Sequence, residues 1–148
     1  TSRSMYVGQC VKLNTPNAKT VDKALYAVVI RALSMIRNSP DIEKVSIPGS
    51  CDCGYMLTKY EKGDFYKYHS DAGKVARFHR SLTCLIYLND VEEGGETEFK
   101  HQGIKVKPEK GKLVMFPPGW THLHRSNEVI SNEKYIMVTW FGDKENRS

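Results

Sequence analysis

Residues 65–74, FYKYHSDAGK, place a histidine and an aspartate two positions apart at the end of a run typical of a β-strand. Side chains two apart on a strand point to the same face, so His69 and Asp71 could both bind one metal ion. A third protein ligand would complete a set of two histidines and one carboxylate. Such a set leaves open positions on the metal and is diagnostic of non-haem Fe(II) oxygenases.

The third ligand has four histidine candidates: His79, His101, His122 and His124. His122 and His124 follow the turn signalled by FPPGW and lie beside a strand pattern, which places them better than the other two. The two share a face by alternation. The residues alone therefore leave His122 and His124 both open.

A lysine lies on an apolar strand face near the C-terminus. In EKYIMVTWF, residues 133–141, Lys134 alternates with Ile136, Val138 and Trp140. A charged group on such a face is costly unless it meets a buried anion. Two interpretations remain open: a lysine that extends its amine to water at the strand end, or a salt bridge to a small dicarboxylate inside a barrel.

The elements that must position these residues begin with one helix. Residues 20–38 predict this helix, with Thr20 as N-cap, Asp22 in the first turn and Arg37 in the last. Asn38, Ser39 and Pro40 follow and should end it. Its buried stripe is expected to contain Val21, Leu25, Val28, Val29, Ala32, Met35 and Ile36.

Short strands make up the remainder of the pattern. One is expected within residues 3–13, and residues 41–52 are expected to form a loop. Further strands are predicted at 53–61, 64–71, 81–90, 96–100, 104–108, 112–117 and 133–141, with turn residues between them. This spacing favours a mainly β (α+β) fold, an antiparallel barrel or jelly roll with the helix packed outside. We expect one domain over residues 1–148, with a helix-containing support at 1–50 and the catalytic core at 51–143.

Charge and hydropathy indicate which partners and which compartment to expect for the protein. The 148 residues carry a formal net charge of +5, but the lysines are scattered. We therefore expect a solvated surface rather than a nucleic-acid footprint. No apolar run is long enough to span a membrane, and the start of the chain does not resemble a signal peptide. The expectation is a monomer in a cytoplasmic setting, with no membrane partner.

The cysteines do not follow a metal-binding pattern. Cys10, Cys51, Cys53 and Cys84 include no Cys-x-x-Cys pair, which argues against a zinc knuckle. Cys84 lies within an apolar strand pattern and is expected to be a small buried residue. We expect the thiols to be reduced.

An ordered set of segments resembles a known family. LTKYEKGDFYKYHSD, LTCLIYLND, GGETEF, GKLVMFPPGWTHLH and KYIMVTW are similar to segments of the 2-oxoglutarate- and Fe(II)-dependent dioxygenases, above all the prolyl 4-hydroxylase branch. The resemblance covers roughly residues 53–141 and implies a double-stranded β-helix core. In this family the distal histidine precedes the basic residue by ten. The resemblance therefore implies His69, Asp71 and His124 as the Fe(II) ligands, with His122 as the runner-up.

The resemblance also implies roles for residues around the metal. Lys134 would hold the far carboxylate of 2-oxoglutarate, Tyr60 would line that pocket, and Tyr87 would donate a second hydrogen bond to the carboxylate. Arg80 would contact the substrate at the pocket mouth, and Trp140 would lie near the substrate proline. An ordinary barrel aromatic, a solvated arginine and a core tryptophan are the alternatives for Tyr60, Arg80 and Trp140.

The implied activity is hydroxylation. Such an enzyme uses Fe(II), 2-oxoglutarate and O₂, with ascorbate as reductant, and releases succinate and CO₂; its substrate would be a proline-containing peptide or protein. A bacterial, viral or algal-type setting fits the short chain. One alternative is a nucleic-acid demethylase, but that group carries two arginines where this chain has Lys134 and Trp140. Another is a non-catalytic, cupin-like metal-binding module.

Overall fold

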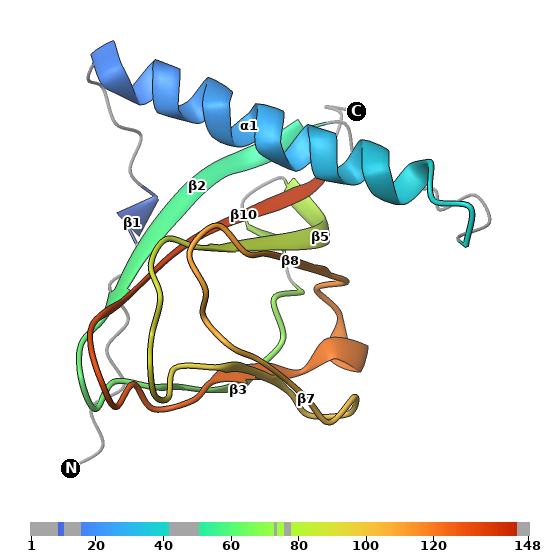
Figure 1. Cartoon of the computed structure of the whole chain (residues 1–148). Helices are drawn as coiled ribbons and strands as arrows, with labels where there is room; N and C mark the ends of the chain where they lie inside the picture. The colour runs from blue at the N-terminus through green and yellow to red at the C-terminus, as the bar shows by residue number, and fades with distance from the viewer. Residues whose placement is uncertain (1–8, 11–15, 42–50, 73, 76–77, 145–148) are drawn as a thin grey trace.

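The computed structural model describes residues 9–10, 16–41, 51–72, 74–75 and 78–144 (Figure 1). Within them a two-residue strand and one long helix precede a series of β-strands. The elements are β1 (Gln9–Cys10), α1 (Pro16–Arg37), β2 (Cys51–Tyr60), β3 (Tyr66–His69), β4 (Lys74–Val75), β5 (Phe78–Tyr87), β6 (Thr97–Phe99), β7 (Ile104–Val106), β8 (Leu113–Phe116), the 3₁₀ turn η1 (Trp120–His122), β9 (His124–Ser126) and β10 (Lys134–Lys144).

The strands form two antiparallel sheets. The larger sheet has the order β1-β2-β10-β5-β4, with β8 also paired to β5, and the smaller has the order β3-β9-β6-β7. Figure 1 shows α1 laid along one side of the larger sheet and the smaller sheet on the other side. This arrangement confirms the prediction of a mainly antiparallel β protein with one helix.

Alternation along the central strands divides the core in two. On β5, Cys84 and Ile86 face the helix, whereas Leu85 and Tyr87 face the smaller sheet. On β10, the buried inward residues are Lys134, Ile136, Val138 and Trp140. The predicted face of β10 is therefore present, and its lysine is buried with its apolar neighbours.

The helix begins earlier than predicted. It starts at Pro16, so Thr20 lies inside the helix rather than at its N-cap, and the first turn contains no acidic residue. Proline suits the first helical position because its φ is already helical. A backbone N–H at this position has no partner within the helix, so proline loses no hydrogen bond by lacking one. Arg37 is in the last turn, as predicted.

The buried stripe of α1 is also narrower than predicted. Val29 is fully buried and Leu33 nearly so, and both pack on the larger sheet. By contrast, Val21, Val28 and Met35 are 46%, 52% and 67% exposed. The helix residues that pack on the sheet, Leu25, Val29 and Leu33, form a single i, i+4 row, so the apolar residues on either side of that row remain in solvent.

The predicted strands of the core are present, with shifted ends, but two short strands were missed. β4 pairs with β5, and β9 lies between β3 and β6. Cys84 is a buried free cysteine, as predicted. Most of the strand predicted at 3–13 and of the loop predicted at 41–52 lies outside the described residues.

Candidate metal centre and adjoining pocket

Two neighbouring strands bring the histidines together. The register of β3 with β9 places His69 opposite His124, and their ring centroids are 4.3 Å apart. Asp71 follows the end of β3. One ligand atom from each of these residues lies within 4.8 Å of the others. Donor atoms bound to one transition metal at about 2.1 Å are at most about 4.2 Å apart, so a small inward shift would place all three on one ion.

Asp71 does not reach this position in the way that the sequence predicted. β3 ends at His69, so the aspartate lies in the following loop rather than on the same strand face. The loop is fixed by its neighbours. The Ser70 hydroxyl and the Ala72 amide both donate to the carbonyl of Pro118, at 2.8 and 2.7 Å, and Arg80 Nη1 donates to the carbonyl of Asp71 at 3.0 Å.

Backbone carbonyls fix the tautomers of both histidines. His69 Nδ1 lies 2.8 Å from the carbonyl of Lys67, and His124 Nδ1 lies 3.0 Å from that of His122. A carbonyl can only accept, so each Nδ1 carries a proton. A neutral ring then leaves a lone pair on Nε2, the usual arrangement in a metal-binding histidine.

These lone pairs face a carboxylate. Asp71 Oδ1 lies 3.3 Å from His69 Nε2 and 3.7 Å from His124 Nε2. Three acceptor atoms so close to one another repel unless a positive charge lies between them. The donor set therefore fits a cation, and two imidazoles with one carboxylate suit Fe(II).

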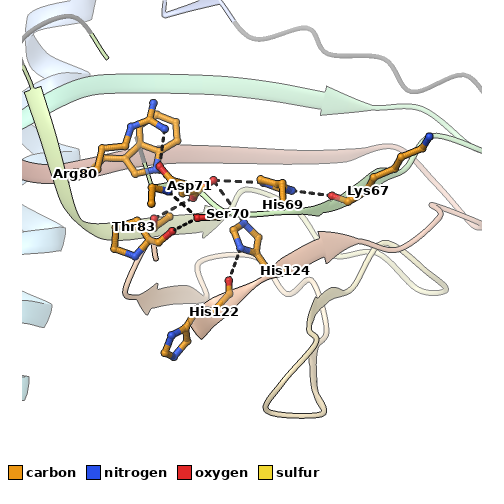
Figure 2. Close-up of polar contacts among 11 residues, drawn as sticks. Lys67, His69, Ser70, Asp71, Arg80, Thr83, His122 and His124 are labelled. Carbon is orange, nitrogen blue, oxygen red and sulfur yellow. Dashed lines mark hydrogen bonds and ion pairs between the residues drawn. The ribbon is translucent and has the colours of Figure 1, made fainter. Parts of the chain in front are cut away.

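The other oxygen of Asp71 is held by two donors. Thr83 Oγ1 donates to Oδ2 at 3.0 Å, and Trp140 Nε1 donates to the same atom at 3.1 Å. Burial alone would raise the pKa of Asp71, but the contact with His69, the positive charge that His124 carries when it is protonated in acid, and the Trp140 hydrogen bond together keep the pKa of this carboxyl below its usual value. Asp71 is therefore an anion whose Oδ1 is aimed at the histidines (Figure 2).

His124 lies in an apolar environment. Its ring packs 4.6 Å from Phe116 and 5.9 Å from Phe99, centroid to centroid. Burial lowers its pKa from the usual histidine value despite the nearby charge of Asp71. The ring is therefore neutral near pH 7 and able to bind a metal through Nε2.

The remaining histidine candidates lie elsewhere. Figure 2 shows the ring of His122 pointing away from Asp71, and its Nδ1 lies 3.0 Å from Thr121 Oγ1. Only its backbone carbonyl takes part, as the acceptor for His124. His79 and His101 are exposed and outside the cluster. Among the described histidines the structure thus brings His124 to His69 and Asp71.

A cavity of about 180 Å³ extends from this cluster into the sandwich. Its walls come from both sheets and include Leu85, Ile136 and Val138 beside the three candidate ligands. Lys134 lines the end of the cavity that is remote from Asp71. The pocket therefore has a candidate metal at one end, apolar walls and an amine at the other end.

The amine of Lys134 is 1% exposed and has no acidic partner within ion-pair distance in the described part of the chain. Its Nζ donates to the carbonyl of Gly95 at 2.9 Å and to Ser126 Oγ, and lies 4.1 Å from the centroid of the Tyr60 ring. Burial lowers the pKa of Lys134 to about 7, and the charge of Glu96 only partly opposes this effect. Such a site favours an incoming anion.

The segment GGETEF supplies part of this site. Gly94 and Gly95 have φ of +79° and +71°, as expected for turn glycines, and a Cβ on Gly94 would lie 2.2 Å from the carbonyl oxygen of Glu128. Only glycine allows the chain to pass there. Glu96 Oε2 accepts from Asn127 Nδ2 at 3.3 Å, which is a structural contact.

Comparison with known proteins identifies the family. Residues 55–142 match the profile described as the 2OG-Fe(II) oxygenase superfamily. The chain belongs to this superfamily. Its match to prolyl 4-hydroxylases places it near that branch: "Probable prolyl 4-hydroxylase 9" of Arabidopsis thaliana is 32% identical over 126 residues, and "Prolyl 4-hydroxylase 13" of the same plant is 32% identical over 117 residues.

The alignments cover 67% and 61% of this chain but 44% and 43% of those two relatives, so the chain spans less than half of their length. A similar fold occurs in the viral collagen prolyl hydroxylase from Paramecium Bursaria Chlorella virus-1. The TM-score is 0.68 at 24% identity, over 88% of this chain and 77% of that one. In the described part of this oxygenase, no helix is both long enough and apolar enough to cross a bilayer.

The pocket of this oxygenase contains one of the two predicted tyrosines. Tyr60 lines the cavity beside Lys134. Tyr87 shares the inward face of β5 but does not line the cavity; its hydroxyl lies 2.6 Å from Thr97 Oγ1 and 3.2 Å from the carbonyl of Val106. The structure therefore does not place the Tyr87 hydroxyl where a 2-oxoglutarate carboxylate would accept from it.

The two predicted substrate residues pack on each other. The Arg80 guanidinium lies 3.7 Å from the centroid of the Trp140 ring, and both side chains line the cavity. Arg80 Nε is buried without a hydrogen-bond partner among the described residues. Arg80 is thus not a solvated surface arginine. Trp140 is 5% exposed and supports Asp71 through its indole N–H, a role that the sequence analysis missed.

Proposed function

We propose that this chain is an Fe(II)- and 2-oxoglutarate-dependent hydroxylase with the double-stranded β-helix core of its superfamily. The observation that carries the proposal is that one pocket has a candidate metal site at one end and a buried amine at the other. At one end, lone pairs of His69 and His124 converge on the Asp71 carboxylate. At the other, Lys134 is a buried amine without an acidic partner in the part of the chain that the structure describes. A metal and a small dicarboxylate complete these two ends.

The metal would be held by His69 Nε2, Asp71 Oδ1 and His124 Nε2. Bound there, Fe(II) would supply with 2-oxoglutarate and O₂ the oxidising power to insert one oxygen atom into a C–H bond, leaving succinate and CO₂. Ascorbate is the reductant that we propose for maintaining Fe(II).

The protein residues bind, orient and exclude water. Lys134 would gain a full charge when the far carboxylate arrives, because an anion nearby favours the protonated amine. Leu85, Ile136 and Val138 provide apolar walls that keep water from the pocket. Thr83 and Trp140 hold Oδ2 of Asp71, so that its Oδ1 keeps the orientation needed for binding.

The proposed substrate is a proline-containing peptide or protein. Support comes from the curated relatives, which are named as prolyl 4-hydroxylases at about a third identity. Arg80 lines the same cavity, and its Nε–H, which has no partner among the described residues, could donate to a substrate carbonyl or carboxylate. Its stacking on Trp140 holds the guanidinium plane in place.

Peptide mass spectrometry tests this proposal. The protein is incubated with Fe(II), ascorbate, 2-oxoglutarate, O₂ and a library of proline-containing peptides, and succinate is measured in the same samples. We expect a mass gain of one oxygen atom on proline in some peptides, with matching succinate. Asp71→Ala is the control. Succinate without a modified peptide would point to a different substrate, whereas metal binding with no succinate under any condition would favour a non-catalytic metal-binding module.

A further inference from the structure

Thr58 is a buried threonine on the wall of the pocket. It is 7% exposed, lies on the inward face of β2 between Met56 and Tyr60, and lines the same cavity as Lys134. Within the described residues its Oγ1 has no hydrogen-bond partner. Buried hydroxyls are generally paired, and an unpaired one in a pocket calls for an explanation.

The strand register places Thr58 close to Lys134. β10 pairs Lys134 with Tyr60 and Ile136 with Thr58, so Thr58 and Lys134 are diagonal neighbours on one face of the sheet. Such neighbours lie about 7 Å apart at Cα. β10 continues from Ile136 to Trp140, which contacts Asp71. Thr58 is therefore a diagonal neighbour of Lys134 and lies nearer than Lys134 to the metal end of the sheet.

In this structure the Tyr87 hydroxyl is not placed as a second donor for an anion at this end. The Tyr87 hydroxyl is already bound to Thr97 and lies outside the cavity lining. Lys134 Nζ has three N–H groups, and Gly95 and Ser126 accept from two of them. One N–H remains for a carboxylate, which can accept several hydrogen bonds.

We propose that Thr58 Oγ1 is the second donor to the far carboxylate of 2-oxoglutarate, beside Lys134. The inference rests on the proposed function, because it takes 2-oxoglutarate as the occupant of the pocket. A hydroxyl that donates to a carboxylate makes a charge-assisted bond, stronger than one between neutral groups. Rotation about the Cα–Cβ bond exchanges the hydroxyl with the methyl group in staggered steps, so Oγ1 can turn toward a carboxylate held by Lys134.

The test compares two substitutions and two ligands. Thr58→Val removes the hydroxyl and keeps the shape, whereas Thr58→Ser keeps the hydroxyl. Thr58→Ala removes the hydroxyl without adding volume and repeats the measurement if valine disturbs the fold. Each protein is loaded with Mn(II) and titrated with 2-oxoglutarate and with 2-oxopentanoate, which lacks the far carboxylate, by calorimetry. Melting temperatures without ligand report on folding.

We expect Thr58→Val to weaken 2-oxoglutarate binding by about tenfold or more and to leave 2-oxopentanoate binding unchanged. Thr58→Ser should stay close to the wild type, and the melting temperature of Thr58→Val should be equal or higher. Equal 2-oxoglutarate affinity in wild type and Thr58→Val would overturn the assignment and leave the proposed function standing. An equal loss for both ligands would also overturn it. Failure of the Mn(II)-loaded wild type to bind 2-oxoglutarate would overturn both.

Discussion

The two ends of the pocket are built in opposite ways. At the metal end, each candidate ligand is fixed by a neighbour: His69 and His124 by backbone carbonyls, and Asp71 by Thr83 and Trp140. At the other end, Lys134 is a buried amine without an acidic partner among the described residues. Nearby, the Thr58 hydroxyl has no partner among the described residues.

This difference indicates which end is prepared in advance. The metal end has its acceptor atoms already oriented, so a cation can bind without much rearrangement. At the lysine end, burial of the amine carries a desolvation cost in free energy that is offset only when an anion binds. We infer that the metal end is preorganised by the protein, whereas the lysine end is completed by its ligand.

The largest effect should follow removal of one candidate ligand at the prepared end. His124→Ala deletes an imidazole whose Nε2 faces Asp71. We expect succinate release to fall to background. Metal affinity, measured by titration with Mn(II), should drop by more than the roughly 10–100-fold that loss of a supporting hydrogen bond costs.

His122→Ala is the matched control, only two residues away. The side chain of His122 is outside the cluster, and the contact with His124 uses the backbone carbonyl, which alanine retains. Metal affinity should therefore stay close to that of the wild type. If His122→Ala lost the metal while His124→Ala kept it, the ligand assignment would be wrong.

A smaller but selective effect is expected at the lysine end. Lys134→Ala removes the amine from the pocket wall and should weaken 2-oxoglutarate binding by about ten- to a hundredfold, the worth of one charge-assisted hydrogen bond of roughly 1.5–3 kcal/mol. Mn(II) affinity should not change, because no candidate ligand is altered. Anaerobic calorimetry of the metal-loaded protein measures both.

Lys134→Arg sharpens the same test. Arginine keeps the charge but presents a planar fork, which fits poorly where the Gly95 carbonyl and Ser126 accept from a compact ammonium. Its affinity for 2-oxoglutarate should lie between those of the wild type and Lys134→Ala. If all three proteins bound 2-oxoglutarate equally, Lys134 would have no role in holding it.

Much of the metal end could be predicted from spacing, but for a reason that was partly wrong. Two-residue periodicity drew attention to His69 and Asp71, although Asp71 lies beyond the strand. The choice of His124 over His122 needed β9, a strand of three residues that the pattern did not reveal. So short a strand carries almost no periodic signal and depends on its neighbours β3 and β6 for its hydrogen bonds.

The two-residue alternation of side chains predicted the faces of the long strands in the larger sheet more reliably. It predicted that Lys134 shares a face with Ile136, Val138 and Trp140, and these residues are buried together. It could not show which polar atoms lack partners, because hydrogen-bond partners come from distant strands. The pairing of Tyr87 with Thr97, and the lack of a partner for the Thr58 hydroxyl among the described residues, are properties of the folded sandwich.

An intermediate effect at the metal end should follow removal of either group that donates a hydrogen bond to Asp71 Oδ2. Trp140→Phe removes the indole N–H that donates to Oδ2 but keeps an aromatic ring beneath Arg80. We expect metal affinity to fall by roughly tenfold, the lower end of the usual cost of losing such support. Thr83→Val, which removes the other donor to Oδ2, should have a similar effect.

These two substitutions also separate support of Asp71 from contact with substrate. A residue that only contacts substrate would change the KM for peptide and leave Mn(II) affinity untouched. If Trp140→Phe raised the peptide KM without weakening the metal, Trp140 would be a substrate residue, as the family resemblance implied. If it weakened the metal as Thr83→Val does, its main role would be to orient Asp71.

The smallest effect is a pH dependence near neutrality that should come from the amine at the lysine end. Burial lowers the pKa of Lys134 to about 7 in the free protein, and a bound carboxylate should raise it again. Only the protonated amine attracts the carboxylate strongly. Affinity for 2-oxoglutarate should therefore be constant well below pH 7 and should fall above it, by about threefold between pH 6.5 and 7.5.

Proton uptake provides the direct measurement of this effect. At pH 8 most Lys134 amines of the free protein are neutral, so binding 2-oxoglutarate should take up nearly one proton; at pH 6 it should take up almost none. Calorimetry in buffers of different ionisation enthalpy counts these protons, with Lys134→Met as the control that should show no such uptake.

The same pKa shift of Lys134 affects the stability of the fold. Because the unfolded lysine, with a pKa near 10.5, binds more protons than the folded one above pH 7, the ligand-free wild type should gain stability relative to Lys134→Met as pH rises from 7 toward 10. Uptake that did not change with pH would mean that Lys134 is charged before the ligand arrives, and the contrast between a prepared end and a ligand-completed end would be lost.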